Sequence, residues 1–438
     1  MRPREPSLPA HPDAADAARA RLASDLRQRS RALSRSVLGA FAKVPRHVFV
    51  PEVAPDAAYR DEAFVIKCGP DGMPVSSSSQ PAMMAIMLDQ LRLRPGHRVL
   101  EIGTGSGYNA AVMAAVVGPR GKVISIDIDP ELVARARASL AAVGCDSVTV
   151  ICADGGFGDP DNAPFDRIIV TAGAWDISPA WLGQVAAGGL LVLPLSVQGI
   201  QLSVALRRDD DGTGWRSASS WRCGFVRMLG AFAGPEKVMQ VGEPDHLVVQ
   251  VPDGSAVDPR ALQAALAGQP AAEQVLPHPR GLAELEDLDL WLTMSAGALD
   301  RVSVLAAGSW FPPALPLPAG FLVSHGTEAN RLGAAVLLPG GRDAAHGEGP
   351  GAVIRGFGPG GPALADYLAG LARRWVELGR PEAQDLQLAV WSPDRRRTGS
   401  PRPDGSLVLE RPSVSIEVSW PLRRPDSPSR LGRLPSRR

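Results

Sequence analysis

The chain has 438 residues with 46 basic and 46 acidic side chains, and 45% of its residues are apolar. This length predicts two or three domains, and the composition is that of a soluble globular protein. Zero net charge gives no indication of nucleic acid or an acidic membrane surface as a partner, and no stretch reaches the ~18 consecutive apolar residues of a membrane span.

The cysteines give no sign of a disulfide framework or a metal site, because the four of them lack paired spacing; they are Cys68, Cys145, Cys152 and Cys223. No apolar run follows the N-terminus, so we expect no signal peptide. We therefore expect free thiols, no bound metal and a cytoplasmic location.

The first half of the chain alternates between helix and strand patterns. Helices are predicted at residues 36–50, 81–93, 108–117, 130–143 and 181–187. Strands are predicted at residues 99–102, 123–126, 148–152, 167–171 and 190–193. This alternation predicts an α/β fold: a doubly wound, mostly parallel, Rossmann-like sheet with helices on both faces. Residues 201–206 and 225–229 are expected to form a closing hairpin, joined by the turn-forming run at 209–212.

From about residue 236 glycine and proline become more frequent and the apolar runs become short. We predict a second domain of the α+β class, with one clear helix along residues 364–378 and strands at 247–251, 321–324, 334–338, 386–391, 407–409 and 415–420. The expected organisation is a partly disordered N-terminal tail (1–35), a first domain (36–235), an accessory domain (236–421) and a disordered basic tail (422–438).

A glycine-rich loop follows the first predicted parallel strand and precedes a helix. It contains Gly103, Gly105 and Gly107, directly after Glu101 and Ile102. A dinucleotide-binding loop would need its third glycine one residue later. The spacing therefore favours a ligand without a pyrophosphate, and S-adenosylmethionine fits. We expect Glu101 to suit the cationic amino group of that cofactor.

Acidic residues end the next two predicted strands. Asp127 is placed to accept hydrogen bonds from ribose hydroxyls, and Asp154 with Gly155 is placed to take an adenine amino group. The alternative is that the glycines form only a turn and the two aspartates only cap helices. Three such sites at the ends of three consecutive strands favour the cofactor.

Several stretches together resemble the protein-L-isoaspartate (D-aspartate) O-methyltransferase family, over about residues 36–235. They are residues 44–51 (VPRHVFVP), 58–61 (AYRD), 79–81 (SQP), 100–108 (LEIGTGSGY), 163–166 (APFD), 188–194 (GGLLVLP) and 223–226 (CGFV). The resemblance implies an enzyme that methylates isoaspartate in proteins; the ester then forms a succinimide, which reopens to aspartate or isoaspartate.

The resemblance also implies site residues. Ser79 would be the active-site serine, with Ser77 and Ser78 sharing its task. The residues implied to hold S-adenosylmethionine are Glu101, Gly103, Thr104, Gly105, Gly107, Asp127, Ile128, Asp154, Gly155 and Thr171. No general base is needed, because a carboxylate acceptor with a pKa of about 4 is already ionised.

The chain departs from the family pattern in two ways. Ser77, Ser78 and Ser79 stand where the family reads Thr-Ile-Ser, and about 200 residues follow the matched region. This combination is similar to the branch found with ribosomally made, modified peptides such as lanthipeptides and graspetides, whose acceptor is an Asp in a constrained peptide. The expected partner is then a peptide or protein carrying Asp or isoAsp. A general repair enzyme and a non-catalytic cofactor-binding module are the alternatives, and the sequence predicts no oligomeric state.

Overall fold

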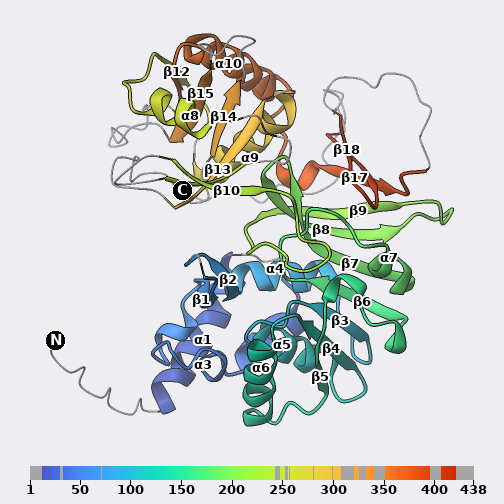
Figure 1. Cartoon of the computed structure of the whole chain (residues 1–438). Coiled ribbons are helices and arrows are strands. Elements are labelled where there is room, and N and C mark those ends of the chain that lie inside the picture. Colours follow the sequence, from blue (N-terminus) through green and yellow to red (C-terminus); the bar gives the residue numbers. More distant parts are fainter. Residues whose placement is uncertain are drawn as a thin grey trace.

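The computed structural model describes residues 12–29, 33–70, 72–241, 247–251, 255, 257–279, 281–297, 299–306, 320–324, 332–339, 351–394 and 406–420. Within them the chain forms a two-stranded hairpin, a ten-stranded sheet (the large sheet) and a seven-stranded sheet (the small sheet). The small sheet and its helices form a separate layer beside the large sheet (Figure 1).

Five neighbouring strands of the large sheet are parallel, in the order β5-β4-β3-β6-β7. They are β3 (Arg98–Ile102), β4 (Lys122–Asp127), β5 (Val148–Cys152), β6 (Phe165–Val170) and β7 (Val185–Val197). The helices between and before them are α4 (Pro81–Leu91), α5 (Tyr108–Val117), α6 (Pro130–Ala142) and α7 (Pro179–Gln184). The predicted doubly wound α/β fold is therefore confirmed. The strand order reverses beside β3, which is where such sheets bind ligands.

Alternating side chains of these strands face two different apolar cores. Val99 and Val123 belong to a core that includes the helices α2 (Arg35–Lys43), α4, α5 and α6. Leu100 and Ile124 belong to the other core, which includes Trp181 of α7 and continues into the C-terminal part of the chain. Most inward residues on both faces are apolar, as expected of strands buried on both sides, and Glu101, Ser125 and Arg167 are buried polar exceptions.

The large sheet continues from β7 with antiparallel strands. The strand β8 (Ile200–Arg208) pairs with β9 (Trp215–Cys223) across the predicted turn. The expectation that residues 225–229 form the second strand of this hairpin is wrong. The turn is short, so pairing starts at Trp215, and Gly173 forms a bridge with Arg227 in the following loop.

The small sheet is antiparallel throughout, in the order β10-β11-β13-β14-β15-β16-β12. Its strands are β10 (Lys237–Val241), β11 (Leu247–Val251), β12 (Ala272–Leu276), β13 (Asp300–Ala306), β14 (Gly320–Ser324), β15 (Gly333–Pro339) and β16 (Ala352–Phe357). The helices α9 (Leu282–Ser295) and α10 (Gly361–Glu377) contribute to the core on one face, and α8 (Pro259–Leu266) contributes to the core on the other. This is the α+β arrangement that the sequence predicted.

The C-terminal strands do not stay with the small sheet. The strands β17 (Gln387–Trp391), β18 (Leu407–Glu410) and β19 (Ser415–Ser419) extend the large sheet, with β17 beside β9. The predicted accessory domain of residues 236–421 is therefore corrected: its last strands complete the sheet of the first domain. Pairing between residues so distant in sequence leaves no local pattern to read.

The N-terminal tail also differs from expectation. Residues 12–29 form helix α1 (Pro12–Arg29), whose residues Ala15, Ala18, Leu22 and Leu26 are buried in the core that contains α2 and α5. The low average hydropathy of this segment hid the helix, although its few buried residues recur at helical spacing. Residues 1–11 and the predicted basic tail at 422–438 lie outside the described residues.

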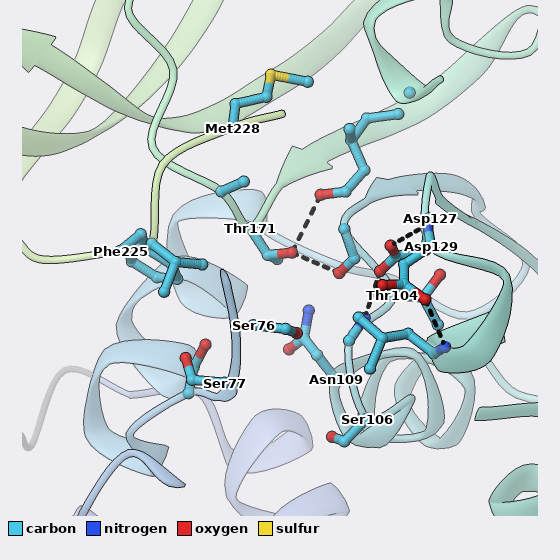
Figure 2. A pocket seen from close by; sticks show the side chains of 18 of the residues that line it. Ser76, Ser77, Thr104, Ser106, Asn109, Asp127, Asp129, Thr171, Phe225 and Met228 are labelled. Carbon is cyan, nitrogen blue, oxygen red and sulfur yellow. Dashed lines mark hydrogen bonds between the residues drawn. The ribbon is translucent and has the colours of Figure 1, made fainter. Parts of the chain in front are cut away.

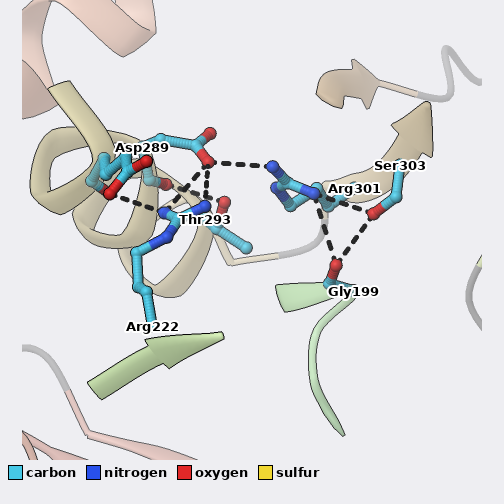
Figure 3. Close-up of polar contacts among 7 residues, drawn as sticks. Gly199, Arg222, Asp289, Thr293, Arg301 and Ser303 are labelled. Carbon is cyan, nitrogen blue, oxygen red and sulfur yellow. Dashed lines mark hydrogen bonds and ion pairs between the residues drawn. The ribbon is translucent and has the colours of Figure 1, made fainter. Parts of the chain in front are cut away.

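A polar network joins the small sheet to the large one (Figure 3). The carboxylate of Asp289 on α9 accepts from Arg222 of β9 at 3.1 Å and from Arg301 of β13 at 2.8 Å. Partial burial would raise the pKa of Asp289, but the two guanidinium groups hold it below its ordinary value. Arg301 also donates to the carbonyl of Gly199 in the turn between β7 and β8. The network therefore fixes the C-terminal unit against that turn.

Candidate active site

A cleft open to solvent lies at the carboxyl ends of β3, β4 and β6. One wall is the strand β2 (Pro74–Ser78), which pairs with β1 (Phe64–Cys68), and the opposite wall is the loop of residues 225–229. Figure 2 shows side chains from these walls and from the glycine loop converging on one space. This position matches the switch point of the sheet.

The glycine loop forms the floor of the cleft, and its backbone requires glycine. Gly103 has a φ of 99°, and a Cβ there would lie 2.7 Å from the Thr171 hydroxyl oxygen. That hydroxyl donates to the carbonyl of Gly103 at 2.6 Å and to that of Ile102 at 3.0 Å. The loop therefore sits tightly against the end of β6, and no side chain stands between its backbone and a ligand.

Asp127 presents its carboxylate to the cleft from the end of β4. It accepts hydrogen bonds from the backbone N–H groups of Gly105 at 2.8 Å and Asp129 at 3.1 Å. Burial raises the pKa of Asp127, while these N–H groups act in the opposite direction. Each carboxylate oxygen keeps acceptor capacity for a further donor, as ribose hydroxyls would supply.

Glu101 lies beneath the glycine loop and not in the lining of the cleft, which differs from the direct contact that we expected. Its side chain is fully buried and accepts from Asn109 at 2.7 Å and from Ser125 at 2.5 Å. Ser125 is its neighbour across the β3–β4 pairing, on the same face of the sheet. Burial raises the pKa of Glu101 to about 7, against the lowering effect of its hydrogen bonds.

Asp154 is also outside the cleft lining, whereas Gly155 is part of it. The Asp154 carboxylate accepts from the backbone N–H groups of Gly156 at 2.8 Å and Ala231 at 2.7 Å. It therefore caps the short helix η2 (Gly155–Phe157) and holds the loop after residue 229. Ile128 does line the cleft, with 40% of its surface exposed.

All of the predicted serines line the cleft. Ser76 and Ser78 lie on the buried side of β2, and Ser77 and Ser79 are half-buried. The Ser78 hydroxyl is inaccessible to solvent and has no hydrogen-bond partner within the described part of the chain. A buried hydroxyl without a partner is uncommon in a folded protein, so Ser78 keeps an unused hydrogen-bond donor behind the wall of the cleft.

A buried arginine that sequence reasoning missed holds the serine segment in place. Arg46 is fully buried and donates to the carbonyls of Ser79 at 2.9 Å and Ser78 at 3.4 Å. It also donates to the carbonyls of Ala58, Arg60 and Glu62, each at 2.9 Å. Burial lowers the pKa of Arg46 to about 10, so it stays charged at neutral pH.

Sequence reasoning also missed Arg227, which lines the cleft from the loop of residues 225–229. Its guanidinium donates to the carbonyl of Glu236 at 2.5 Å. The resemblance had marked the neighbouring Phe225 and Val226, but we interpreted this segment as a strand. Elsewhere, His47 lies 2.8 Å from the Tyr59 hydroxyl and His97 accepts from the Arg94 amide, and neither lines the cleft.

Metal and membrane features are absent from the described residues. No group of three or more His, Cys, Asp or Glu side chains there is arranged to hold a metal ion. No helix in the same residues combines the length and apolarity needed to span a bilayer.

The parallel sheet, its glycine loop and the acidic residue after the second strand together define an α/β enzyme that binds an adenosyl cofactor. The family model of protein-L-isoaspartate(D-aspartate) O-methyltransferase matches residues 17–230. A protein-L-isoaspartate O-methyltransferase of Archaeoglobus fulgidus is 47% identical over 197 residues, covering 45% of this chain and 86% of that protein. One of Methanopyrus kandleri is 42% identical over 222 residues, covering 50% and 95%.

Among solved structures, a protein-L-isoaspartate O-methyltransferase matches at 22% identity with a TM-score of 0.47, covering 85% of this chain and 96% of that one. A putative protein-L-isoaspartate O-methyltransferase from Plasmodium falciparum, in complex with S-adenosyl-L-homocysteine, matches at 22% identity with a TM-score of 0.41, covering 48% and 97%.

The chain belongs to the protein-L-isoaspartate (D-aspartate) O-methyltransferase family. It is a methyltransferase, and the cofactor of its family is S-adenosylmethionine. The cleft fits that cofactor, because a carboxylate stands at the end of β4 and the glycine backbone is open beside it.

Proposed function

We propose that this enzyme methylates the carboxylate of an Asp or isoAsp residue in a peptide, leading to succinimide and isoaspartate during maturation of a ribosomally made peptide. The observation that carries this proposal is the serine-lined wall of the cleft beside a C-terminal unit that shares the large sheet. Family membership alone supports the coarser activity on isoaspartate in proteins.

The cofactor-binding residues are assigned by their place in the cleft. Asp127 would accept from the ribose hydroxyls, and Ile128 would cover an apolar face of the nucleoside. Gly103 and Gly105, with Thr104, would hold the cofactor along the loop backbone, and Gly107, which lies outside the lining, would support the turn into α5. Thr171 supports that loop through its hydrogen bonds to Gly103 and Ile102. Glu101 and Asp154 would act from outside the cleft, by holding the loops that line it.

The acceptor side of the cleft supplies donors for a carboxylate. When bound, the cofactor supplies a methyl group on a sulfonium, and the acceptor oxygen needs no base because it is already ionised. Ser78 and Ser79 would donate to one carboxylate oxygen, and Ser77 would assist from the same segment. The remaining N–H groups of Arg227 would draw the acidic side chain into the cleft. Fixing the acceptor in this way can supply roughly 7–11 kcal/mol of barrier lowering.

We propose that residues from 236 onward contribute to binding the peptide, and that the enzyme works in the cytoplasm. Free thiols at all four cysteines support a reducing compartment.

The deciding experiment compares two acceptors: a linear isoaspartyl peptide, and a short peptide encoded beside this gene with its constraining crosslinks in place. Faster methyl transfer to the constrained peptide is expected. A preference for the linear isoaspartyl peptide would instead assign the chain to general repair. Cofactor binding without transfer to either peptide would favour a non-catalytic module.

The serine assignment has its own test. Ser79→Ala should lower methyl transfer while leaving the affinity for S-adenosylhomocysteine nearly unchanged, and Ser36→Ala at an exposed site is the matched control. Equal loss of affinity and turnover in Ser79→Ala would count against an acceptor-side role.

A further inference from the structure

A second cavity, of about 370 Å³, lies where the large sheet meets the C-terminal unit. We call it the interdomain cavity. Its lining includes Trp175 after β6, Gln198 in the turn between β7 and β8, Asp300 at the start of β13, and Arg411 after β18. It shares no lining residue with the cleft among the described residues.

Gln198 offers a hydrogen-bond acceptor that the protein does not use. Its side-chain oxygen Oε1 is buried and has no partner within the described ranges of the chain. The residue has a φ of 48°, a conformation that an ordinary side chain adopts rarely. The next residue, Gly199, is held through its carbonyl by Arg301 and by Ser303 at 2.8 Å (Figure 3). The backbone at this turn is therefore held in place, and Oε1 of Gln198 remains an unused acceptor on a residue that lines the cavity.

The charges of the interdomain cavity favour neutral or basic ligand groups. Three carboxylate residues contribute to its lining: Glu236, Asp300 and Glu410. The guanidinium of Arg411 lies 4.1 Å from the centre of the Trp175 ring, and Arg301 is paired with Asp289. An acidic ligand group would therefore meet more like charge than a basic one would.

The interdomain cavity lies only a few residues along the chain from the cleft. Arg227 lines the cleft and donates to the carbonyl of Glu236, which lines the cavity. Thr171 likewise lines the cleft, and Trp175 lines the cavity. Four extended residues span at most about 13–14 Å. A polypeptide with its acceptor residue in the cleft would therefore reach the cavity within a few residues.

We infer that the interdomain cavity is a subsite for the substrate polypeptide, and this rests on the proposed function. A residue about four positions from the methylated one donates its main-chain N–H to the oxygen Oε1 of Gln198. The side chain at that position is neutral or basic.

The test uses the full chain and isoaspartyl peptides of two lengths, about five and about eleven residues, with the acceptor central. The variant is Gln198→Asn, which withdraws the oxygen by one methylene and keeps a residue type that tolerates a positive φ. Its matched control is Gln387→Asn, at an exposed position on β17. For the long peptide, Gln198→Asn should raise KM roughly three- to tenfold with kcat unchanged. The short peptide should respond to neither variant. Trp175→Leu should reproduce the effect on the long peptide.

Peptide chemistry gives a second arm. A long peptide with Lys four positions from the acceptor should bind more tightly than one with Glu there. Equal KM changes for both peptide lengths, or no preference for Lys over Glu, would overturn the subsite.

Binding of a long peptide with Asn in place of the acceptor, followed by fluorescence anisotropy, separates the subsite from the activity. Weakened binding in Gln198→Asn supports the subsite even where no peptide is methylated, and that lack of methylation would count against the proposed function alone. Unchanged binding in Gln198→Asn rejects the subsite.

Discussion

Glu101→Gln tests whether the acid beneath the glycine loop is a buried support or a direct ligand for the cofactor. The replacement keeps the size of the side chain and its hydrogen bonds. The amide oxygen can still accept from Asn109, and the new amide can donate to Ser125, whose hydroxyl lies 2.6 Å from that of Thr104. The loop should therefore keep its shape in this variant.

The magnitude follows from the raised pKa of Glu101, about 7 in the folded protein against a reference of 4.5. The folded state holds the proton more tightly, so this stabilisation is complete below pH 4.5 and is lost as the pH rises through 7. The loss amounts to about 3 kcal/mol, since each pKa unit corresponds to about 1.4 kcal/mol. Glu101→Gln removes this component, and its free energy of unfolding should depend less on pH.

The assay is urea unfolding of both proteins, free of cofactor, at several pH values from 5 to 8. The quantity compared is the difference between the two chains, because other groups titrate equally in both. The same replacement at the exposed Glu286 controls for the loss of a carboxylate. If the free energy of unfolding varies with pH in the same way in wild type and Glu101→Gln, the raised pKa of Glu101 would be refuted. A hundredfold loss of affinity for S-adenosylhomocysteine in Glu101→Gln would instead indicate that Glu101 contacts the cofactor directly.

Three further predictions concern the same cleft. Arg46→Lys replaces a guanidinium that donates to five carbonyls. The free energy of unfolding measured in urea should fall by about 2–4 kcal/mol, and methyl transfer should fall as well. An unchanged stability would contradict the role given to this arginine. Asp127→Ala should weaken S-adenosylhomocysteine binding by roughly tenfold or more by calorimetry, and an unaltered affinity would reject the ribose assignment. Gly103→Ala should abolish cofactor binding because its Cβ would lie 2.7 Å from the Thr171 hydroxyl. The control Gly39→Ala, with open space around its Cβ, should bind the cofactor normally. Cofactor binding by both variants would show that the loop adapts.

Local patterns predicted the first half of the fold well. The helix at 108–117 and the strand at 148–152 agree with α5 and β5. The helix is a continuous apolar run between Gly107 and Gly118, and the strand is a short run of β-branched residues. The strand β9 was missed, since it is rich in serine: Ser220 is buried and its hydroxyl donates to the carbonyl of Ala383. That contact depends on residues more than 160 positions away, which no local pattern reports.

The site was predicted in its composition more than in its geometry. Gly103, Gly105, Asp127 and the serines line the cleft because motif spacing survives in the loops at strand ends. Gly107 does not line it and instead precedes α5, packed against Ala136. Glu101 was expected to contact the cofactor. Because side chains alternate along a strand, it lies instead on the face of the sheet that it shares with Ser125. Arg46 had no recognisable role because it acts through carbonyls of distant segments.

The pairing of β17 with β9 has a consequence for how this enzyme is made and dissected. During synthesis, one edge of the large sheet stays open until the ribosome has delivered the residues of β17, and open edges invite aggregation. A truncation after residue 235 would create the same open edge permanently. A loss of activity in that fragment would reflect damage to the scaffold as much as loss of peptide binding. Point substitutions in the intact chain are therefore the appropriate way to test the function of the C-terminal unit.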